Sequence, residues 1–270
     1  MPETLELKTN RSINRVDLMN TQKGIATLFL HGFSGSADTW FEITSKFNGY
    51  SITPDIIGHG KSKYINLNAD YNINDWCTDM NEILKLLNVN RLNICGYSMG
   101  GRLAVAFAAK HPKKINSLMV EGGNIGIKDK IAREDRCKAD LKLSKFISED
   151  LEKFINLWES NPLFKSQKKR NHEAFMLQRN IRLSQNAPQL SKALKTFSQG
   201  SMDYFEEEFS KFDFPISIIN GSEDTKYIST GRNMTKINSN CTHHIIEKSN
   251  HNVHLESPEI FLKLVNNTFI

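Results

Sequence analysis

The chain of 270 residues contains 39 % hydrophobic and 24 % charged residues. This length and composition suit one large α/β domain, with or without an insertion, and argue against global disorder. The net charge of +5 is too small to indicate a nucleic-acid-binding protein by itself. The longest wholly apolar run, residues 103–109, is much shorter than the roughly 20 residues that cross a membrane. Residues 1–20 lack the apolar segment of a signal peptide.

The cysteines are widely spaced and form no C-x-x-C pair. They are Cys77, Cys95, Cys137 and Cys241. This spacing predicts reduced, mostly buried thiols in a cytoplasmic protein and gives no sign of a disulfide framework or a zinc site. The sequence also lacks a dinucleotide-binding or phosphate-binding glycine motif, so we expect no metal and no organic cofactor.

The first half of the chain alternates short apolar runs with helical patterns. Such alternation indicates βαβ units and a mostly parallel sheet. The predicted strands are 25–30, 50–53, 92–95 and 115–120. The predicted helices are 38–47 (with Asp38 as its cap), 74–87 and 100–110.

The pattern changes between residues 127 and 199, where helical periodicity continues without a convincing strand. The predicted helices there are 128–143, 148–158, 169–184 and 188–197. Alternation then resumes with strand 216–220, helix 227–234, strand 243–247 and helix 258–266. We therefore expect a core made of residues 1–124 and 201–270, interrupted by a helical lid at 125–200. This lid holds 16 basic and 9 acidic residues, and so carries the positive excess of the chain.

The segment Gly96-Tyr97-Ser98-Met99-Gly100 matches G-x-S-x-G. It lies directly after a predicted buried strand and directly before a predicted buried helix. A sharp strand-to-helix turn needs small residues on both sides of the serine and lifts the hydroxyl off the sheet. The position therefore predicts that Ser98 is a catalytic serine.

A catalytic serine needs a histidine to take its proton and a carboxylate to orient that histidine. In this architecture the chain order is serine, acid, histidine. His251 lies in a polar loop between the last predicted strand and the last helix, which predicts the histidine. The loop after strand 216–220 offers two acids. We select Asp224 and keep Glu223 as the alternative.

The segment His31-Gly32-Phe33-Ser34-Gly35 follows the first core strand. Its small residues let the backbone approach a ligand. We therefore expect the backbone N–H groups of Phe33 and Met99 to form an oxyanion hole.

Together these motifs resemble the α/β-hydrolase superfamily over nearly the whole chain. A closer resemblance is to the 2-succinyl-6-hydroxy-2,4-cyclohexadiene-1-carboxylate (SHCHC) synthases of menaquinone biosynthesis. The segments that carry it are Gly96–Arg102, Val120–Gly123, the Arg133, Arg136 and Asp140 spacing, Trp158 with Pro162–Phe164, and Arg179.

The resemblance implies a carbon–oxygen lyase that eliminates pyruvate from 2-succinyl-5-enolpyruvyl-6-hydroxy-3-cyclohexene-1-carboxylate by proton abstraction through a Ser-His-Asp triad. It also implies that arginines bind the substrate carboxylates. The implied substrate-binding residues are Tyr97, Arg102, Arg136, Trp158 and Arg179. The expected partner is a small tricarboxylate, with no nucleic acid or membrane, in a monomer or weak homo-oligomer.

Two other readings use the same residues. A serine hydrolase acting on carboxylic esters or on carbon–carbon bonds of diketones needs the same triad, but a neutral substrate gives Arg102 and the lid arginines no reason to converge. A non-enzymatic binding protein usually has a broken triad, whereas candidates for all three members are present here. A dehalogenase is disfavoured because it would carry an aspartate in place of Ser98.

Overall fold

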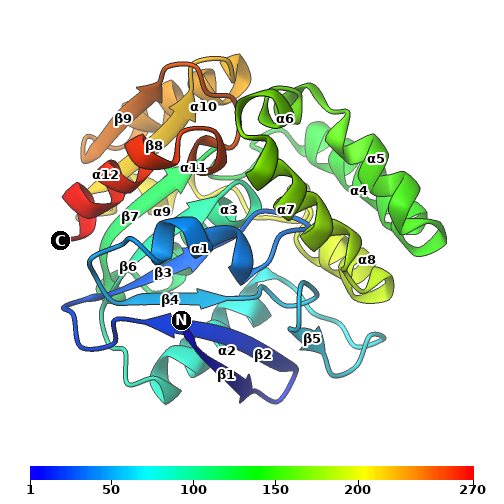
Figure 1. The fold of residues 1–270 in the computed structure, drawn as a ribbon, viewed down its shortest axis with the longest axis horizontal. Coiled ribbons are helices and arrows are strands. Elements are labelled where there is room, and N and C mark those ends of the chain that lie inside the picture. The colour runs from blue at the N-terminus through cyan, green and yellow to red at the C-terminus, as the bar shows by residue number, and fades with distance from the viewer.

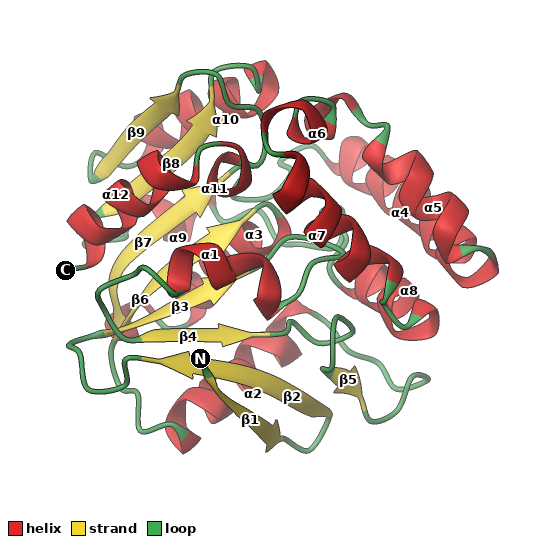
Figure 2. Ribbon diagram, in the orientation of Figure 1, coloured by secondary structure: helices red, strands yellow, loops and turns green.

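A computed structural model describes residues 1–270. A nine-stranded sheet runs through its centre, with helices on both faces (Figures 1 and 2). The strand order is β1-β2-β4-β3-β6-β7-β8-β9, and β5 pairs with β2. The strands are β1 (Glu3–Lys8), β2 (Ser12–Met19), β3 (Ala26–Leu30), β4 (Ser51–Pro54), β5 (Lys63–Tyr64), β6 (Leu92–Tyr97), β7 (Ile115–Glu121), β8 (Ile216–Gly221) and β9 (Cys241–Ile246).

The adjacent strands β4, β3, β6, β7, β8 and β9 run parallel to one another, which confirms the predicted mostly parallel α/β architecture. Strand β2 pairs antiparallel with both β4 and β5. The antiparallel hairpin of β1 and β2 at one edge was not predicted. It pairs in register from Glu3 with Leu18 to Lys8 with Ile13. The hairpin buries Val16 and Leu18 but leaves most of β1 partly or fully exposed, so its apolar signal in the sequence is weak.

The helices outnumber the strands. The α-helices are α1 (Phe41–Thr44), α2 (Ile73–Leu86), α3 (Met99–Lys110), α4 (Lys130–Glu149), α5 (Leu151–Glu159), α6 (Gln167–Arg170), α7 (His172–Leu183), α8 (Ala187–Thr196), α9 (Glu206–Ser210), α10 (Thr225–Ile237), α11 (Val253–Glu256) and α12 (Pro258–Phe269). Short 3-10 helices occur at η1 (Ala37–Trp40), η2 (Pro112–Lys114) and η3 (Pro162–Phe164). No helix is both long and apolar enough to cross a lipid bilayer.

Alternate residues of the strands face opposite sides of the sheet and build two separate cores. On β3, Leu28 and Leu30 pack in the larger core with α2 and α3, whereas Phe29 packs in the second core with α1 and α12. On β6, Ile94 faces the first core and Cys95 faces the second. Burial on both faces fixes the register of β6, the strand that directly precedes Ser98.

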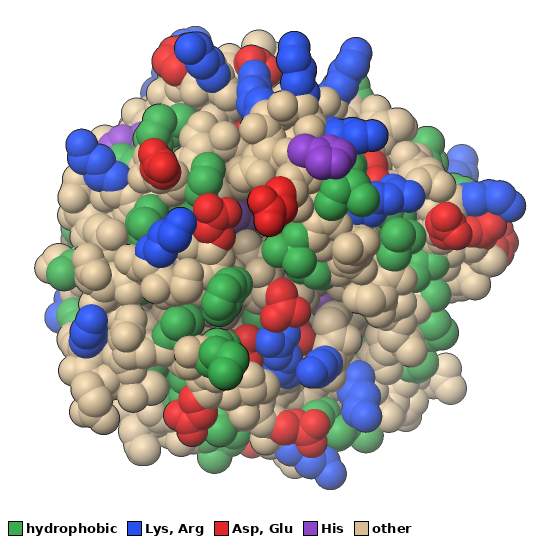
Figure 3. Space-filling view, viewed as in Figure 1, with side chains coloured by type: hydrophobic (Ala, Val, Ile, Leu, Met, Phe, Trp, Pro, Cys, Tyr) green, Lys and Arg blue, Asp and Glu red, His purple; other side chains and the backbone are tan.

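Helices α4 to α8 lie between β7 and β8 in the chain and gather on one side of the molecule (right in Figure 1). They share a small core of their own, formed by Ile147, Phe154, Ile155, Leu190 and Leu194. On the face shown in Figure 3, basic and acidic side chains are interspersed and form no single-sign stripe.

Two predicted helix boundaries were wrong because side-chain caps intervene. Ser36, and not Asp38, caps the short helix after β3, since the Ser36 hydroxyl accepts a hydrogen bond from the Asp38 N–H. The predicted helix 169–184 is divided at Asn171, whose side chain accepts from the Ala174 N–H and starts α7. An asparagine that caps a helix favours a break over continued helix.

Candidate active site

Ser98 lies at the turn between β6 and α3 with φ of 51° and ψ of −105°, a backbone conformation that is uncommon for a residue with a side chain. The turn closes because its flanking residues are glycines. A Cβ on Gly96 would lie 2.3 Å from the Gly100 carbonyl oxygen, and one on Gly100 would lie 2.1 Å from the Leu30 carbonyl oxygen. The close approach of α3 to β6 therefore requires glycine at position 96, and its approach to β3 requires glycine at position 100.

The structure brings Ser98, His251 and Asp224 into one hydrogen-bonded chain. The Ser98 Oγ and His251 Nε2 atoms are 3.0 Å apart, and His251 Nδ1 donates to Asp224 Oδ2 at 2.7 Å. Both the His251 and the Asp224 side chains are buried. Glu223, the alternative acid, instead forms an ion pair with Arg170. This geometry has the form in which an oriented imidazole can take a proton from a serine hydroxyl.

One glycine and the aromatic rings of Tyr97, Phe164 and Tyr227 surround the His251 ring. Gly122 (φ +56°) lies so close that an added Cβ would be 2.8 Å from His251 Cε1. The rings of Tyr227 and Phe164 pack 4.6 and 6.1 Å from the imidazole, measured between centroids. Burial raises the pKa of Tyr227 and keeps this phenol neutral beside the histidine.

The residues predicted to form an oxyanion hole lie on either side of the nucleophile. Phe33 follows β3, and Met99 is the first residue of α3. Neither backbone N–H takes part in a backbone hydrogen bond of the turns and loops. A Cβ on Gly32 would lie 2.7 Å from the Tyr97 ring, so the Phe33 loop can reach Ser98 only with glycine at this position.

A cavity with about 330 Å³ of empty space opens next to Ser98. Its lining contains two of the predicted substrate contacts, Tyr97 and Trp158. The remaining lining residues are Gly32, Phe33, Gly35, Thr39, Phe164, Gln178 and Arg182. Trp158 and Phe33 pack edge to face, so α5 and the loop after β3 form adjacent walls of this cavity.

Arg182 and Gln178 line this cavity but were not predicted. The Arg182 side chain is 3 % exposed, and burial lowers its pKa. Its Nη2 donates to Gln178 Oε1 at 2.8 Å, and its guanidinium lies 5.5 Å from the Phe164 ring centroid. Residues 178 and 182 are four apart, so they share one face of α7. The one signal in the sequence that could have identified Arg182 and Gln178 is their position on the buried face of a predicted helix.

The three predicted arginines do not line this cavity and have partners within the chain. Arg102 donates through both Nη atoms to the Phe197 carbonyl oxygen at 3.1 Å. Burial lowers the pKa of Arg102 to about 10. Arg136 forms an ion pair with Asp140 at 2.8 Å. Arg179 forms an ion pair with Glu159. The assignment of these arginines to a substrate stays a prediction.

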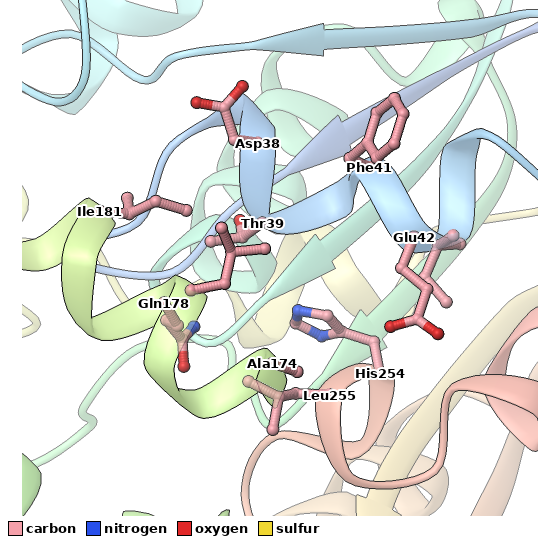
Figure 4. A pocket seen from close by; sticks show the side chains of 11 residues that line it. Asp38, Thr39, Phe41, Glu42, Ala174, Gln178, Ile181, His254 and Leu255 are labelled. Carbon is pink, nitrogen blue, oxygen red and sulfur yellow. The ribbon is translucent and has the colours of Figure 1, made fainter. Parts of the chain in front are cut away.

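A second pocket, with about 520 Å³ of empty space, lies between α1 and α7 and shares Thr39 and Gln178 with the catalytic cavity (Figure 4). His254 projects into it. The His254 Nδ1 atom donates to the buried Glu121 carboxylate at 2.7 Å, and its ring stacks on Trp40 at 4.1 Å between centroids. The Glu121 carbonyl oxygen also accepts the Ser98 N–H at 2.7 Å. Glu121 therefore connects the serine turn to the helix that follows the His251 loop.

The helical block also contacts this loop through Glu256, whose side chain is fully buried. Arg170 Nη1 forms an ion pair with Glu256 Oε2 at 2.5 Å, and the Asn250 N–H donates to the same oxygen at 3.2 Å. Desolvation raises the pKa of Glu256, while its hydrogen bonds with Arg170 and Ser166 oppose this shift. No group of three or more histidine, cysteine, aspartate or glutamate side chains is arranged to hold a metal ion.

Comparison with known proteins agrees with this geometry. Residues 27–258 match the family model described as the alpha/beta hydrolase fold. A protein of Bacillus subtilis (strain 168), provisionally named SHCHC synthase, is 32 % identical over 89 % of this chain and 88 % of its own length. The SHCHC synthase of Enterobacter sp. (strain 638) is 28 % identical over 86 % of each chain. The solved structure of MenH from S. aureus is 27 % identical and covers 94 % of this chain and 97 % of its own, with a TM-score of 0.87.

One assignment agrees with the serine turn, with the buried histidine and carboxylate, and with the length of these matches. The chain belongs to the α/β-hydrolase fold family and, within it, to the family of SHCHC synthases.

Proposed function

We propose that this enzyme eliminates pyruvate from 2-succinyl-5-enolpyruvyl-6-hydroxy-3-cyclohexene-1-carboxylate and releases SHCHC. The observation that carries the proposal is the Ser98–His251–Asp224 hydrogen-bonded chain, which opens on a cavity walled by a buried arginine. Its relatives are named for this product.

The chemistry begins at the buried histidine. His251, held by Asp224, takes the Ser98 hydroxyl proton, and the Ser98 alkoxide removes a ring proton from the substrate. The electron pair of the broken C–H bond at C2 forms a double bond between C2 and C3, the existing C3–C4 double bond shifts to C4–C5, and the C–O bond from C5 to the enolpyruvyl group breaks. That group leaves and is protonated to pyruvate. Ser98 acts here as a base and forms no acyl intermediate, which makes the reaction a lyase reaction on a hydrolase scaffold.

Negative charge develops on the succinyl ketone oxygen during proton removal, because this carbonyl is conjugated with the carbon that loses the proton. The backbone N–H groups of Phe33 and Met99 would hold that oxygen. Donors that are already positioned in a site shielded from water stabilise such charge without having to reorganise, and one donor contributes about 10²–10³-fold to the rate.

Two pairs of arginines would bind the substrate carboxylates. Arg179 and Arg182 lie on α7, with Arg182 in the cavity wall beside Tyr97 and Trp158. Arg102 and Arg136 lie close enough to Tyr227 to influence its pKa, and the charge of Arg136 contributes to the lowered pKa of Arg102. A planar guanidinium matches a carboxylate with two parallel hydrogen bonds.

In this proposal residues 125–200 form a lid over the core made by residues 1–124 and 201–270. The lid supplies Trp158, Arg182 and the contact between Arg170 and Glu256, so its seating would complete the site. Closing a site in this way excludes water from the reacting atoms and strengthens the charge interactions inside.

The experiment that tests the function is pyruvate release from freshly generated substrate, with wild type measured beside Ser98→Ala. One positioned proton transfer contributes about 10²–10⁴-fold, so the variant should lose turnover by at least that factor while its affinity for the substrate stays close to wild type. Retained turnover in Ser98→Ala would refute the mechanism. Folded wild-type enzyme without release above the spontaneous rate would refute the lyase assignment, and a panel of esters and diketones would then follow.

A further inference from the structure

Glu159 is a buried carboxylate next to the catalytic cavity that the proposed reaction does not use. It is the last residue of α5 and follows Trp158, which lines the cavity. Its side chain is 8 % exposed. One carboxylate oxygen accepts from Arg182 Nη1 at 2.9 Å, and the other forms an ion pair with Arg179. One carboxylate thus bridges two guanidinium groups.

The two guanidinium groups differ in their hydrogen-bond partners and in their burial. Arg179 has a second partner, because its Nη2 donates to Asn156 Oδ1 at 2.7 Å. Arg182 is almost fully buried, with Nη1 on Glu159 and Nη2 on Gln178, while its Nε has no hydrogen-bond partner. A buried guanidinium has lost its water, and leaving it without an anion is costly. Glu159 provides that anion in the free enzyme.

This arrangement sets the charge that an incoming substrate meets. The two arginines carry two positive charges, and Glu159 cancels one of them. Each guanidinium offers Glu159 one charged donor through Nη1, and such donors bind a substrate carboxylate in the same way. A substrate carboxylate therefore competes with Glu159 for the same donors.

We propose that Glu159 is an internal carboxylate occupying the anion subsite of Arg179 and Arg182, and that a substrate carboxylate displaces it on binding. Glu159 then acts as a specificity residue. A carboxylate ligand restores the charge pairing that displacement breaks, whereas a neutral ester would leave the buried Arg182 unpaired. The identity of the natural ligand as a tricarboxylate rests on the function proposed above.

The opposite role would be structural, with Glu159 holding both arginines in the orientation that the substrate needs. The two roles predict opposite effects of removing the charge. If Glu159 competes, Glu159→Gln tightens carboxylate binding. If Glu159 only positions the arginines, the same variant weakens it.

The kinetic experiment measures pyruvate release by wild type, Glu159→Gln, Glu159→Asp and Glu152→Gln. We expect Glu159→Gln to lower KM about tenfold, as for the loss of one charged competitor, with kcat within about twofold of wild type. Glu159→Asp keeps the charge but shortens the reach of the carboxylate, so it should lower KM less than Glu159→Gln does. Glu152 is exposed on the same helix, so Glu152→Gln removes an equal charge and should change neither constant.

A binding experiment keeps this test independent of turnover. Succinate, a simple dicarboxylate, is titrated into the same proteins by calorimetry, together with Arg182→Gln. Glu159→Gln should bind succinate about tenfold more tightly than wild type, and Arg182→Gln should bind it more weakly. Unchanged or weaker succinate binding by folded Glu159→Gln would overturn the proposal. Absence of pyruvate release by wild type would reject the proposed function and leave the succinate result to decide the role of Glu159.

Discussion

Gly122 packs against His251, the histidine of the proposed triad. It directly follows β7 with φ of +56°, a region that residues with a side chain avoid. Its backbone lies against the His251 ring, so that an added Cβ would be 2.8 Å from Cε1, 3.0 Å from Nδ1 and 3.1 Å from the His251 carbonyl oxygen. Gly122→Ala therefore perturbs the triad without altering any of its members.

The size of the effect follows from these distances. Non-bonded carbon atoms in contact lie about 3.5–4.0 Å apart, so the imidazole must move by roughly 0.7 Å or more. Such a movement disturbs both the 2.7 Å bond to Asp224 and the 3.0 Å contact with Ser98 Oγ. A misplacement of about 1 Å at a reacting group can cost about 10²-fold in rate. We expect a loss of kcat of that order with little change in KM. The left-handed φ adds about 1–2 kcal/mol of destabilisation.

Gly24→Ala is the matched control. Gly24 has φ of +67°, close to that of Gly122, and a Cβ added there would meet nothing within 4 Å. It therefore carries the backbone cost without the contact on His251. Both variants would be measured by pyruvate release, by thermal unfolding and by the rate at which a fluorophosphonate labels Ser98.

The expected pattern is that both variants lose similar stability and only Gly122→Ala loses kcat and labelling rate. Wild-type kcat in Gly122→Ala would show that His251 can shift without cost, which would refute the argument from contact distance. An equal loss of kcat in Gly24→Ala would show that general destabilisation, and not contact with His251, lowers kcat in both variants.

Two further predictions concern the triad acid and the buried histidines. Asp224→Asn should lower kcat by about 10⁴-fold through loss of His251 orientation, whereas Glu223→Gln should stay within about twofold of wild type, which steady-state kinetics would measure. Burial lowers the pKa of His31 to about 4 from 6.5 and lowers that of His59 as well. Between pH 6.5 and 4 the unfolded chain binds protons that the folded chain does not. The contribution of His31 to the free energy of unfolding should therefore be fully present above pH 6.5. It should decrease by roughly 3 kcal/mol as the pH falls through this range. Urea unfolding at pH 7 and pH 5 would measure this loss of stability. The free energy of unfolding of His31→Asn should depend less on pH than that of wild type.

Local patterns were enough to predict the sharp turn that carries Ser98 between β6 and α3. Gly96 and Gly100 flank Ser98 because the turn has no room for a Cβ, and this requirement is visible in a few consecutive residues. The inner parallel strands were equally readable, since β3, β4, β6, β7 and β8 are short, mainly apolar runs that are buried on both faces. The β1–β2 hairpin could not be predicted, because β1 is largely exposed and its sequence therefore lacks an apolar pattern.

The choice between neighbours needed the fold. Glu223 and Asp224 are adjacent in one loop, and only the path of the chain after β8 determines that Asp224 faces His251 while Glu223 faces Arg170. Arg179 and Arg182 present the same problem on α7, because they are three positions apart, yet Arg179 is partly exposed and Arg182 lies in the cavity wall. Spacing along the chain identifies a helical face but not the element that it packs against.

The charge count of residues 125–200 led to the expectation of an anionic substrate, yet the charge at the site depends on pairing. Arg136, Arg179 and Arg182 all have carboxylate partners within the same helical block. Much of the positive excess therefore comes from lysines, many of them exposed, whose effect on a ligand is screened within about 8–10 Å by salt. A buried arginine acts at full strength only on a ligand that replaces its internal partner. Selectivity for a carboxylate substrate in this enzyme would accordingly depend on how easily Glu159 gives way to it, more than on the number of basic residues in the lid.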